Sequence, residues 1–585
     1  MTPIIDPRNG DIEDDASSTK RRSLLSLLGS LLAEISLPKL AIAWMLLIGL
    51  PGLLLGAAPL VISIWIASVI AKVANIYAEF LPALLLLPLA AFGWFAGRPL
   101  LRLAENSFWS LNALAVQPVY IAFREGLRHL AERLLGHRTS EDRRATVRAV
   151  TAAVSGFAMC GLGIGLVVLV WPATRWVGNT SDLASPLRLT PVVLANSVVM
   201  ISGYFAAAAL IWGSADATMA QPRDFRAYAA GSGDDRQWRV AHLSDIHTVG
   251  ERYGFRIESG RSGPRGNERL SRTLALLDEI HAAKALDVIL ITGDLTDAGR
   301  SAEWAEFFAA LAAFPRLAEL VVALPGNHDV NVVDRANPAR MDLPMSPSKR
   351  LRQVRTISAL GMLQGTRLRV VDTENGRIGG TLAEVLTPHA ADMAAFADKG
   401  SLHLSRTLAA LWTTIFPLVQ PPDTHDGLGI IVLNSNAETH FSFTNALGLV
   451  SAEQARAFRI AVKQYPRACW IVALHHHVIE YPQPARELSE RIGTALINGS
   501  WFIRRLQHLA GRAVIMHGHR HIDWIGACGR LQIVSAPSPV MGATDRQETY
   551  FYVHTFAIGA DRRLRLLEPE RISVRDRQAA DAART

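Results

Sequence analysis

The chain carries no charged side chain between Leu40 and Ala71. Three further apolar runs follow it, at Leu81–Gly97, Thr151–Trp171 and Pro191–Trp212. A helix needs about 20 apolar residues to cross a bilayer, and these runs are about that long or longer. The sequence therefore predicts an all-α transmembrane region with four spans over residues 38–215, preceded by a polar tail over residues 1–37.

The first apolar run is longer than a hydrocarbon core of roughly 30 Å requires. Pro51, Gly52 and Pro59 lie inside it, so the run could be one kinked or tilted helix or a tight hairpin of two. We take it as one span, because two helices here would give an odd number of spans and conflict with the distribution of basic residues.

Basic residues are concentrated in one connection of the membrane region. The segment between the second and third runs, from Arg98 to Arg148, holds nine arginines, whereas the other two connections hold one lysine and two arginines. The positive-inside rule then places the N-terminal tail, this Arg-rich connection and everything after Trp212 in the cytoplasm. We therefore expect a multi-pass protein of a bacterial-type inner membrane, with a bilayer-facing amphipathic helix in the connection.

Net charge and cysteine usage restrict the class of protein further. The formal net charge is +8, which suits a nucleic acid, an anionic membrane surface or an anionic substrate. The membrane is the nearer partner, so we expect no nucleic-acid binding. The three cysteines show no zinc-finger spacing and fit a reducing compartment. Nothing in the sequence indicates the oligomeric state.

Residues 216–237 are polar and contain Gly231-Ser232-Gly233, which predicts a linker. Beyond it, short apolar runs alternate with helical patterns, which predicts an α/β domain over residues 238–570. The runs expected to be buried strands are Val240–Leu243, Val288–Ile291, Leu320–Leu324, Ile430–Leu433, Trp470–Leu474 and Ala513–Met516. The segment from Val330 to Leu428 has no clear period and is expected to hold helical insertions. Residues 571–585 are expected to be a disordered tail.

Five of these six strands run into a polar cluster at the carboxyl end, where open α/β sheets place their ligands. The clusters are Asp245-Ile246-His247, Gly293-Asp294-Leu295-Thr296-Asp297, Gly326-Asn327-His328-Asp329, His475-His476-His477 and Gly518-His519-Arg520-His521. In an extended chain, Asp245 and His247 point to the same side and can converge on one point. Oxygen and imidazole ligands without cysteine suit Mn, Fe or Zn. In chain order the ligand set is Asp, His, Asp, Asn, His, His and His. Seven ligands are too many for one ion and suit two ions that share a carboxylate, for which Asp294 is the natural bridge.

These clusters appear in the order D-x-H, G-D, G-N-H-[DE], a histidine after a late strand, and G-H-x-H. From about Trp238 to Pro569 the chain thereby resembles the calcineurin-like metallophosphoesterase superfamily. The blocks His-Leu-Ser-Asp-Ile-His, Ile-Thr-Gly-Asp-Leu-Thr-Asp and Pro-Gly-Asn-His-Asp are most similar to its bacterial cyclic-nucleotide-phosphodiesterase-like branch. The resemblance implies a four-layer α/β/β/α sandwich and a metal-dependent phosphoric ester hydrolase.

The resemblance also implies roles for individual residues. One ion would be held by Asp245, His247, Asp294 and His521, and the other by Asp294, Asn327, His476 and His519. His328 would protonate the leaving oxygen, with Asp329 orienting it, and Arg520 could bind the phosphate. The family usually has a proline two residues after the late histidine. That position, here Val478, selects His476, and since the proline is absent His475 is the alternative.

The sequence therefore predicts a membrane-anchored phosphodiesterase that uses a dimetal-activated hydroxide to cleave a phosphate ester. Two alternatives remain open at this stage. One is a non-catalytic sensor or scaffold with the same fold, and the other is a phosphomonoesterase or lipid-linked pyrophosphatase.

Overall fold

A computed structural model describes most of the chain. The described residues are 45, 49–76, 117–135, 140–179, 182, 186–231, 235–251, 254, 256, 266–331, 340–341, 347–399, 401–436, 441–442, 446–483, 494, 496–542 and 548–574. The chain divides into two compact units, one over Ile35–Met219 and the other over Met1–Glu34 together with Ala220–Thr585. The two units are described separately below.

The first unit is helical. Its described elements are α3 (Leu50–Ile76), α5 (Gln117–Leu135), α6 (Glu141–Val170), the 3-10 turn η3 (Trp171–Ala173) and α7 (Pro186–Thr218). Among the residues described, three segments are long and apolar enough to cross a membrane, namely Leu50–Ala71, Glu141–Ala173 and Leu187–Thr218. α3 runs through Pro59 without interruption, so the described part of the first run is a single helix. The expected span Leu81–Gly97 lies outside the described residues.

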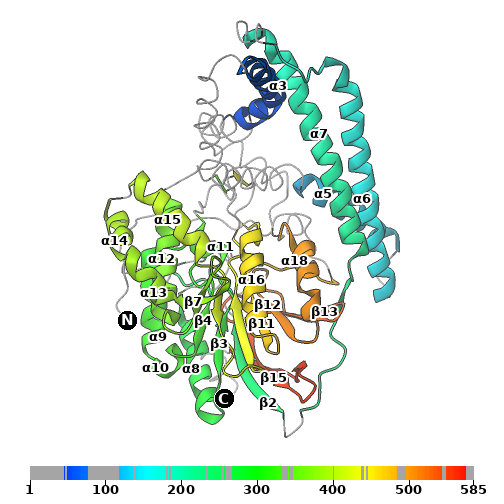
Figure 1. The fold of residues 1–585 in the computed structure, drawn as a ribbon. Coiled ribbons are helices and arrows are strands. Elements are labelled where there is room, and N and C mark those ends of the chain that lie inside the picture. Colours follow the sequence, from blue (N-terminus) through cyan, green and yellow to red (C-terminus); the bar gives the residue numbers. More distant parts are fainter. Residues whose placement is uncertain are drawn as a thin grey trace. The chain divides into compact units, whose positions relative to one another are not determined.

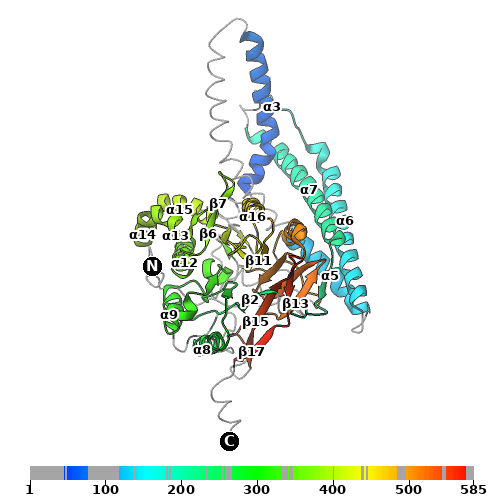
Figure 2. The ribbon, with the colours of Figure 1, turned by 60° about the horizontal axis from the view of Figure 1, so that its bottom comes forward.

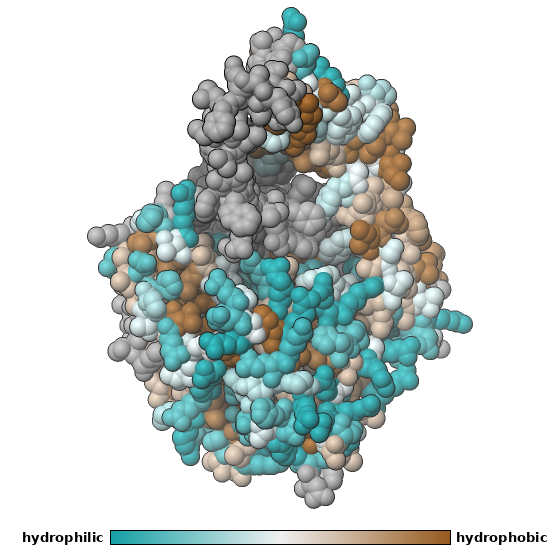
Figure 3. All heavy atoms as spheres, viewed as in Figure 1, coloured by the Kyte–Doolittle hydropathy of each residue, from teal (hydrophilic) through white to brown (hydrophobic). Residues whose placement is uncertain are grey.

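Small residues bring α6 and α7 together, while large apolar side chains face outward. A Cβ at Gly156 would meet Gly213 of α7, so these two helix backbones lie in direct contact. Val154, Phe157 and Leu162 of α6 are about half exposed or more. Brown atoms cover much of the surface over α6 and α7 in Figure 3. Close contact through glycine combined with an apolar exterior is typical of membrane helices.

The described residues of the second unit form two mixed β-sheets and a small two-stranded sheet. The six-stranded sheet has the order β16-β15-β2-β3-β4, with β17 also paired to β15. Its strands are β2 (Arg236–Leu243), β3 (Val288–Ile291), β4 (Val321–Ala323), β15 (Thr549–Ile558), β16 (Leu564–Leu566) and β17 (Glu570–Val574). The nine-stranded sheet has the order β1-β13-β14-β12-β11-β9-β8-β6-β7. Its strands are β1 (Pro222–Asp224), β6 (Arg369–Asp372), β7 (Arg377–Thr381), β8 (Leu418–Gln420), β9 (Leu428–Val432), β11 (Cys469–Ala473), β12 (Ala513–His517), β13 (Trp524–Cys528) and β14 (Leu531–Ser535). The two-stranded sheet pairs β5 (Arg340–Met341) with β10 (Phe441–Ser442) in antiparallel orientation.

Helices flank both sheets (Figure 1). Beside the six-stranded sheet are α8 (Glu268–Ala283), α9 (Ser301–Ala312) and the short α10 (Pro315–Ala318), and α11 (Asn327–Val330) follows β4. Beside the nine-stranded sheet are α16 (Ala452–Gln464), α18 (Gly499–Leu506) and η6 (Gln507–Leu509). A single apolar core includes Val240 and Leu290 of one sheet and Ile471 and Val514 of the other. The predicted α/β sandwich is thereby confirmed.

The expected helices between Val330 and Leu428 are present as α12 (Pro347–Gln364), α13 (Leu382–Leu386), η5 (Thr387–His389), α14 (Ala390–Lys399) and α15 (Leu402–Thr414). Figure 2 shows α12 to α15 grouped near β6 and β7. The sequence prediction missed β6, β7 and β8, which extend the nine-stranded sheet. β6 and β7 are short and only partly buried, and β8 has only three residues, so these strands lack the continuous apolar run that marks the central strands.

Two segments that the sequence predicts to be irregular contain strands. The first four residues of the expected tail belong to β17, where Val574 is buried and pairs with Thr549. The expected linker is also not wholly irregular, because Pro222–Asp224 forms β1 and pairs with β13. Both strands are edge additions, and the partner of β1 lies far away in the sequence, so no local pattern marks β1.

Candidate metal centre

The polar clusters lie at the carboxyl ends of parallel strands. β2, β3 and β4 run parallel in one sheet, and β9, β11, β12 and β14 run parallel in the other. Main-chain hydrogen bonds tie the loops to one another, since Asp245 N donates to Gly293 O and Gly518 N donates to His475 O. The sheet topology thus gathers five loops that are far apart in the sequence.

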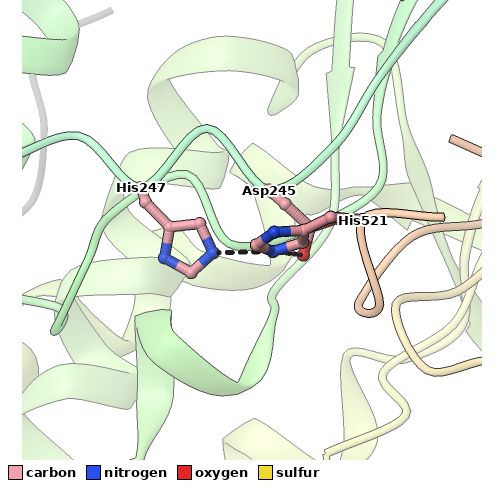
Figure 4. Close-up of side chains that lie close together, drawn as sticks. All are labelled: Asp245, His247 and His521. Atoms are coloured by element: carbon pink, nitrogen blue, oxygen red, sulfur yellow. Dashed lines mark hydrogen bonds and ion pairs between the residues drawn. The ribbon is translucent and has the colours of Figure 1, made fainter. Parts of the chain in front are cut away.

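One group of side chains comprises Asp245, His247 and His521. Figure 4 shows the carboxylate of Asp245 and the imidazole of His247, from the loop after β2, converging with the imidazole of His521 from a second loop. His521 Nε2 lies 3.1 Å from Asp245 Oδ1 and 3.3 Å from His247 Nε2. Asp245 and His247 are fully buried, and the His521 side chain is 16% exposed. Their ligand atoms lie within 4.8 Å of one another, which is close enough to hold one ion.

A second group surrounds the imidazole of His475. Its Nε2 lies 3.2 Å from Asp294 Oδ2, 3.0 Å from Asn327 Oδ1 and 3.1 Å from His519 Nδ1. A single proton on Nε2 can be donated to only one of these three atoms. These buried oxygen and nitrogen atoms point their lone pairs toward one another, and no cysteine is among them. Such a set of atoms fits a divalent cation of the Mn, Fe or Zn type.

Asp294 lies between the two groups. Its Oδ2 is 3.2 Å from His475 Nε2 and 3.7 Å from His247 Nε2, so the same oxygen faces both. Its Oδ1 accepts a hydrogen bond from the main-chain N–H of His328 at 2.9 Å. This is the placement that a carboxylate shared by two ions requires.

The backbone is strained at these residues. The φ angles are 54° at Asp245, 49° at His247, 51° at Asp294, 75° at His519 and 51° at His521. In the described part of the chain, Arg562 is the only other non-glycine residue with a positive φ. Such conformations cost about 1–3 kcal/mol each and concentrate at functional sites.

Two glycines allow the loops to approach. A Cβ at Gly326 would collide with the main-chain N and the carboxylate of Asp294. A Cβ at Gly518 would collide with Ser244 and with the carboxylate of Asp245. Glycine at these positions therefore lets the loops close around the acidic side chains.

The acidic and basic side chains stabilise each other's charge. Burial alone would raise the pKa of Asp294, but the imidazoles of His475 and His328 hold that pKa below its usual range. Burial opposes a charge on His475, yet Asp294 raises its pKa to about 9. The protonated imidazole supplies positive charge to Asp294 when no ion is bound.

The consecutive histidines His475 and His476 lie in different surroundings. The structure places His475, the alternative, among Asp294, Asn327 and His519, whereas His476 Nδ1 lies 2.8 Å from Ser435 Oγ. β11 ends at Ala473 and Leu474 N still bonds to Met516 O, so His475 is the first side chain beyond the sheet. Counting back from Val478, where the family usually has a proline, could not show that His475 has this position.

His475→Ala is therefore expected to weaken Mn²⁺ binding by about 100-fold or more. Substituting residues that only support a ligand typically costs 10–100-fold in affinity, and a direct ligand should reach at least the upper limit. His476→Ala, which removes a ring packed 4.4 Å from that of His519, should cost about tenfold. Calorimetric titration with Mn²⁺ measures both affinities, and an equal or larger loss in His476→Ala would contradict the assignment.

Asp329, which the sequence analysis expects to orient His328, lies among main-chain N–H groups. Its carboxylate accepts hydrogen bonds from the N–H groups of Leu295, Thr296 and Gly326 and from the Thr296 hydroxyl, so it joins two loops. His328 is held differently, because its Nδ1 donates to the main-chain oxygen of Asp297 at 2.6 Å.

Asp297 is a residue to which the sequence analysis assigned no role. Its Oδ1 lies 3.2 Å from His247 Nδ1, and a carboxylate on the outer nitrogen of a ligating histidine fixes the ring and its tautomer. The second acid of Gly-Asp-Leu-Thr-Asp could have indicated this. Asp297 thus supports His247 with its side chain and His328 with its main chain.

Glu303 of α9 supports the loop that follows Asp297. Its Oε2 accepts hydrogen bonds from the N–H groups of Ala298 and Arg300 at 2.8 and 2.9 Å. Burial, followed by the nearby charge of Asp297, raises the pKa of Glu303 to about 8.

Glu303→Gln is expected to stabilise the metal-free protein increasingly as pH rises from 5 to 8. The wild-type carboxyl binds its proton more tightly when folded, so its contribution is complete below its usual pKa and is lost as pH approaches 8. Glutamine keeps an accepting oxygen and does not ionise. Thermal unfolding across this range should show a growing difference in Tm that levels off above about pH 8. A difference that stays constant with pH would contradict the assigned pKa shift.

Arg520 lies between His519 and His521 and is buried. Its Nη1 is 2.9 Å from both carboxylate oxygens of Glu480. The expected contact of Arg520 with a phosphate stays a prediction.

Comparison with known proteins identifies a related domain. Residues 239–387 match the family model described as calcineurin-like phosphoesterase. This segment contains the first three polar clusters and ends before the histidine loops at 475 and 519. No curated protein matches the chain.

Several solved structures share similarity over more than half of the chain. A putative 5′-nucleotidase from Staphylococcus aureus has 13% identity and a TM-score of 0.31, covering 58% of this chain and 55% of that one. A dimetal phosphatase from Danio rerio has 10% identity and a TM-score of 0.34, covering 58% and 98%. The NAD nucleotidase of Haemophilus influenzae has 10% identity and a TM-score of 0.30, covering 58% and 57%. The chain thus spans little more than half the length of the two nucleotidases.

Proposed function

We propose that this protein is a membrane-anchored, metal-dependent phosphodiesterase with its hydrolase domain in the cytoplasm. The observation that carries the proposal is the convergence of seven side chains, with the buried carboxylate of Asp294 between the other six. These are Asp245, His247, Asp294, Asn327, His475, His519 and His521. The phosphoesterase match over residues 239–387 supports the same class of enzyme.

Two divalent ions, of the Mn, Fe or Zn type, fit the two groups. Asp245, His247 and His521 would hold one ion, Asn327, His475 and His519 would hold the other, and Asp294 would bind both. When bound, the ions supply polarisation of the phosphate oxygens and activation of water.

His328 is suited to protonate the leaving oxygen. Because its Nδ1 donates to Asp297 O, Nε2 is the atom through which it can give up a proton. Its ring lies 4.6 Å from that of His247, edge to face, which places it beside the first group. General acid catalysis of this kind typically contributes about 10²–10⁴-fold.

Hydrolysis of two aryl esters by the full-length protein in detergent tests the proposed class. With Mn²⁺, bis(p-nitrophenyl) phosphate should be cleaved faster than p-nitrophenyl phosphate. Faster cleavage of the monoester would indicate a phosphomonoesterase. Metal-loaded, folded protein that turns over neither ester nor a lipid-linked pyrophosphate would favour a sensor or scaffold.

The proposed orientation can be tested in the linker. Ala227 is exposed, and the native Cys469 and Cys528 are buried. Ala227→Cys should resist a membrane-impermeant maleimide in intact cells and react after permeabilisation, with the wild-type chain as the control. Reaction in intact cells would place this segment outside and contradict the proposed topology.

A further inference from the structure

A buried ion pair lies beside the candidate metal centre. Arg520 Nη1 contacts both oxygens of Glu480 at 2.9 Å, and the two side chains are 2% and 12% exposed. The guanidinium also lies 5.2 Å from the ring centre of Tyr481, whose hydroxyl is 2.8 Å from Ser535 Oγ. Burial opposes ionisation of Glu480, but Arg520 holds its pKa well below its usual range, so the pair is charged.

The loop that carries Arg520 is strained on both sides of it. His519 and His521, its two neighbours in the chain, have left-handed φ angles of 75° and 51°. His519 N donates to Asp245 Oδ2 at 2.9 Å, which fixes one side of the loop. Strain of about 1–3 kcal/mol per residue persists only where the surroundings fix the conformation. The Arg520 side chain contacts Glu480 and Tyr481, and through these contacts it is placed to fix the conformation of the strained loop.

Glu480 also reaches the site through a second residue. His477 Nε2 lies 3.7 Å from Glu480 Oε2, and the His477 ring stacks on that of His519, with centroids 6.1 Å apart and 15° between planes. Glu480 therefore contacts Arg520, which follows His519 in the sequence, and His477, whose ring stacks on that of His519.

We infer that Glu480 is a positioning residue, which holds Arg520 and His477 so that His519 and His521 keep the geometry of metal ligands. This inference rests on the proposed metal centre, because His519 and His521 are its ligands there. It gives Arg520 a supporting role in addition to any contact with substrate.

Mn²⁺ affinity of the full-length protein, measured by calorimetry, tests the inference without requiring turnover. Glu480→Gln keeps the shape of the side chain and removes its charge, and should weaken Mn²⁺ binding by about 10–100-fold. The double variant E480Q/R520M avoids a buried unpaired arginine and should fold even where the single variant does not. Because both changes remove the same interaction, its affinity should match that of Glu480→Gln rather than fall further.

Glu570→Gln provides a matched control. Glu570 forms the same type of two-oxygen pair with Arg239 Nη2, at 2.9 and 3.0 Å, on strands β17 and β2. It should leave Mn²⁺ affinity unchanged. Wild-type affinity in either Glu480 variant, or an equal loss in Glu570→Gln, would overturn the inference. Wild-type protein that binds Mn²⁺ but hydrolyses no phosphate ester would contradict the proposed function and leave the positioning role standing.

Discussion

Asp294→Asn is expected to reduce kcat by about 10³-fold and to lower the number of ions bound per chain. Asparagine keeps the size of the side chain and the hydrogen bond from His328 N, but it removes the charge that faces both groups of ligands. Metal ions contribute several kcal/mol of charge stabilisation in the transition state, and each 1.36 kcal/mol corresponds to tenfold in rate. Activity with saturating Mn²⁺ and elemental analysis of the purified variant provide the two readouts.

Asp287→Asn is the matched control for this substitution. Asp287 immediately precedes the same strand, β3, at the end away from the site, where its Oδ2 accepts a hydrogen bond from Arg239 N at 2.7 Å. The control should keep wild-type metal content and kcat within a few-fold. An Asp294→Asn variant that retains full activity and metal content would show that Asp294 is not the shared ligand.

His328→Ala is expected to lower kcat by about 10²–10⁴-fold for substrates whose leaving group is an alkoxide. The effect should be much smaller for p-nitrophenyl esters, because p-nitrophenolate leaves without needing a proton. Metal content should be unchanged, since the main-chain bond from residue 328 to Asp294 is retained. Comparing kcat for an alkyl and an aryl diester separates this role from a structural one.

His508→Ala serves as the control for His328→Ala. His508 is exposed, and its Nδ1 bonds to the main-chain oxygen of Arg505. The His508→Ala substitution should leave kcat unchanged for both the alkyl and the aryl diester. An equal loss for the alkyl and aryl diesters in His328→Ala would contradict proton donation by His328.

The central strands and the positions of the polar clusters could be predicted from the sequence. Val288–Ile291 was predicted to the residue, because a strand buried on both faces must be apolar throughout. The parallel arrangement then required the clusters after β2, β3 and β4 to meet at one edge. The fold class and the gathering of these side chains follow from these two facts.

The remaining details depend on tertiary structure. Three consecutive imidazoles follow β11, and only the paired sheet shows that His475 is the first beyond it. Asp297 and Asp329 are both acids in glycine-containing loops, and only the folded loops show that one contacts His247 while the other binds main-chain N–H groups. No sequence pattern indicates a role for Glu480, because its partner Arg520 is 40 residues away.

The number and coupling of the bound ions test the central claim most directly. Full-length protein loaded with Mn²⁺ should contain two ions per chain and give the electron paramagnetic resonance spectrum of a spin-coupled pair, since the two groups share Asp294. In Asp294→Asn the coupled spectrum should disappear. A single, uncoupled Mn²⁺ in folded wild-type protein would contradict a shared two-ion site.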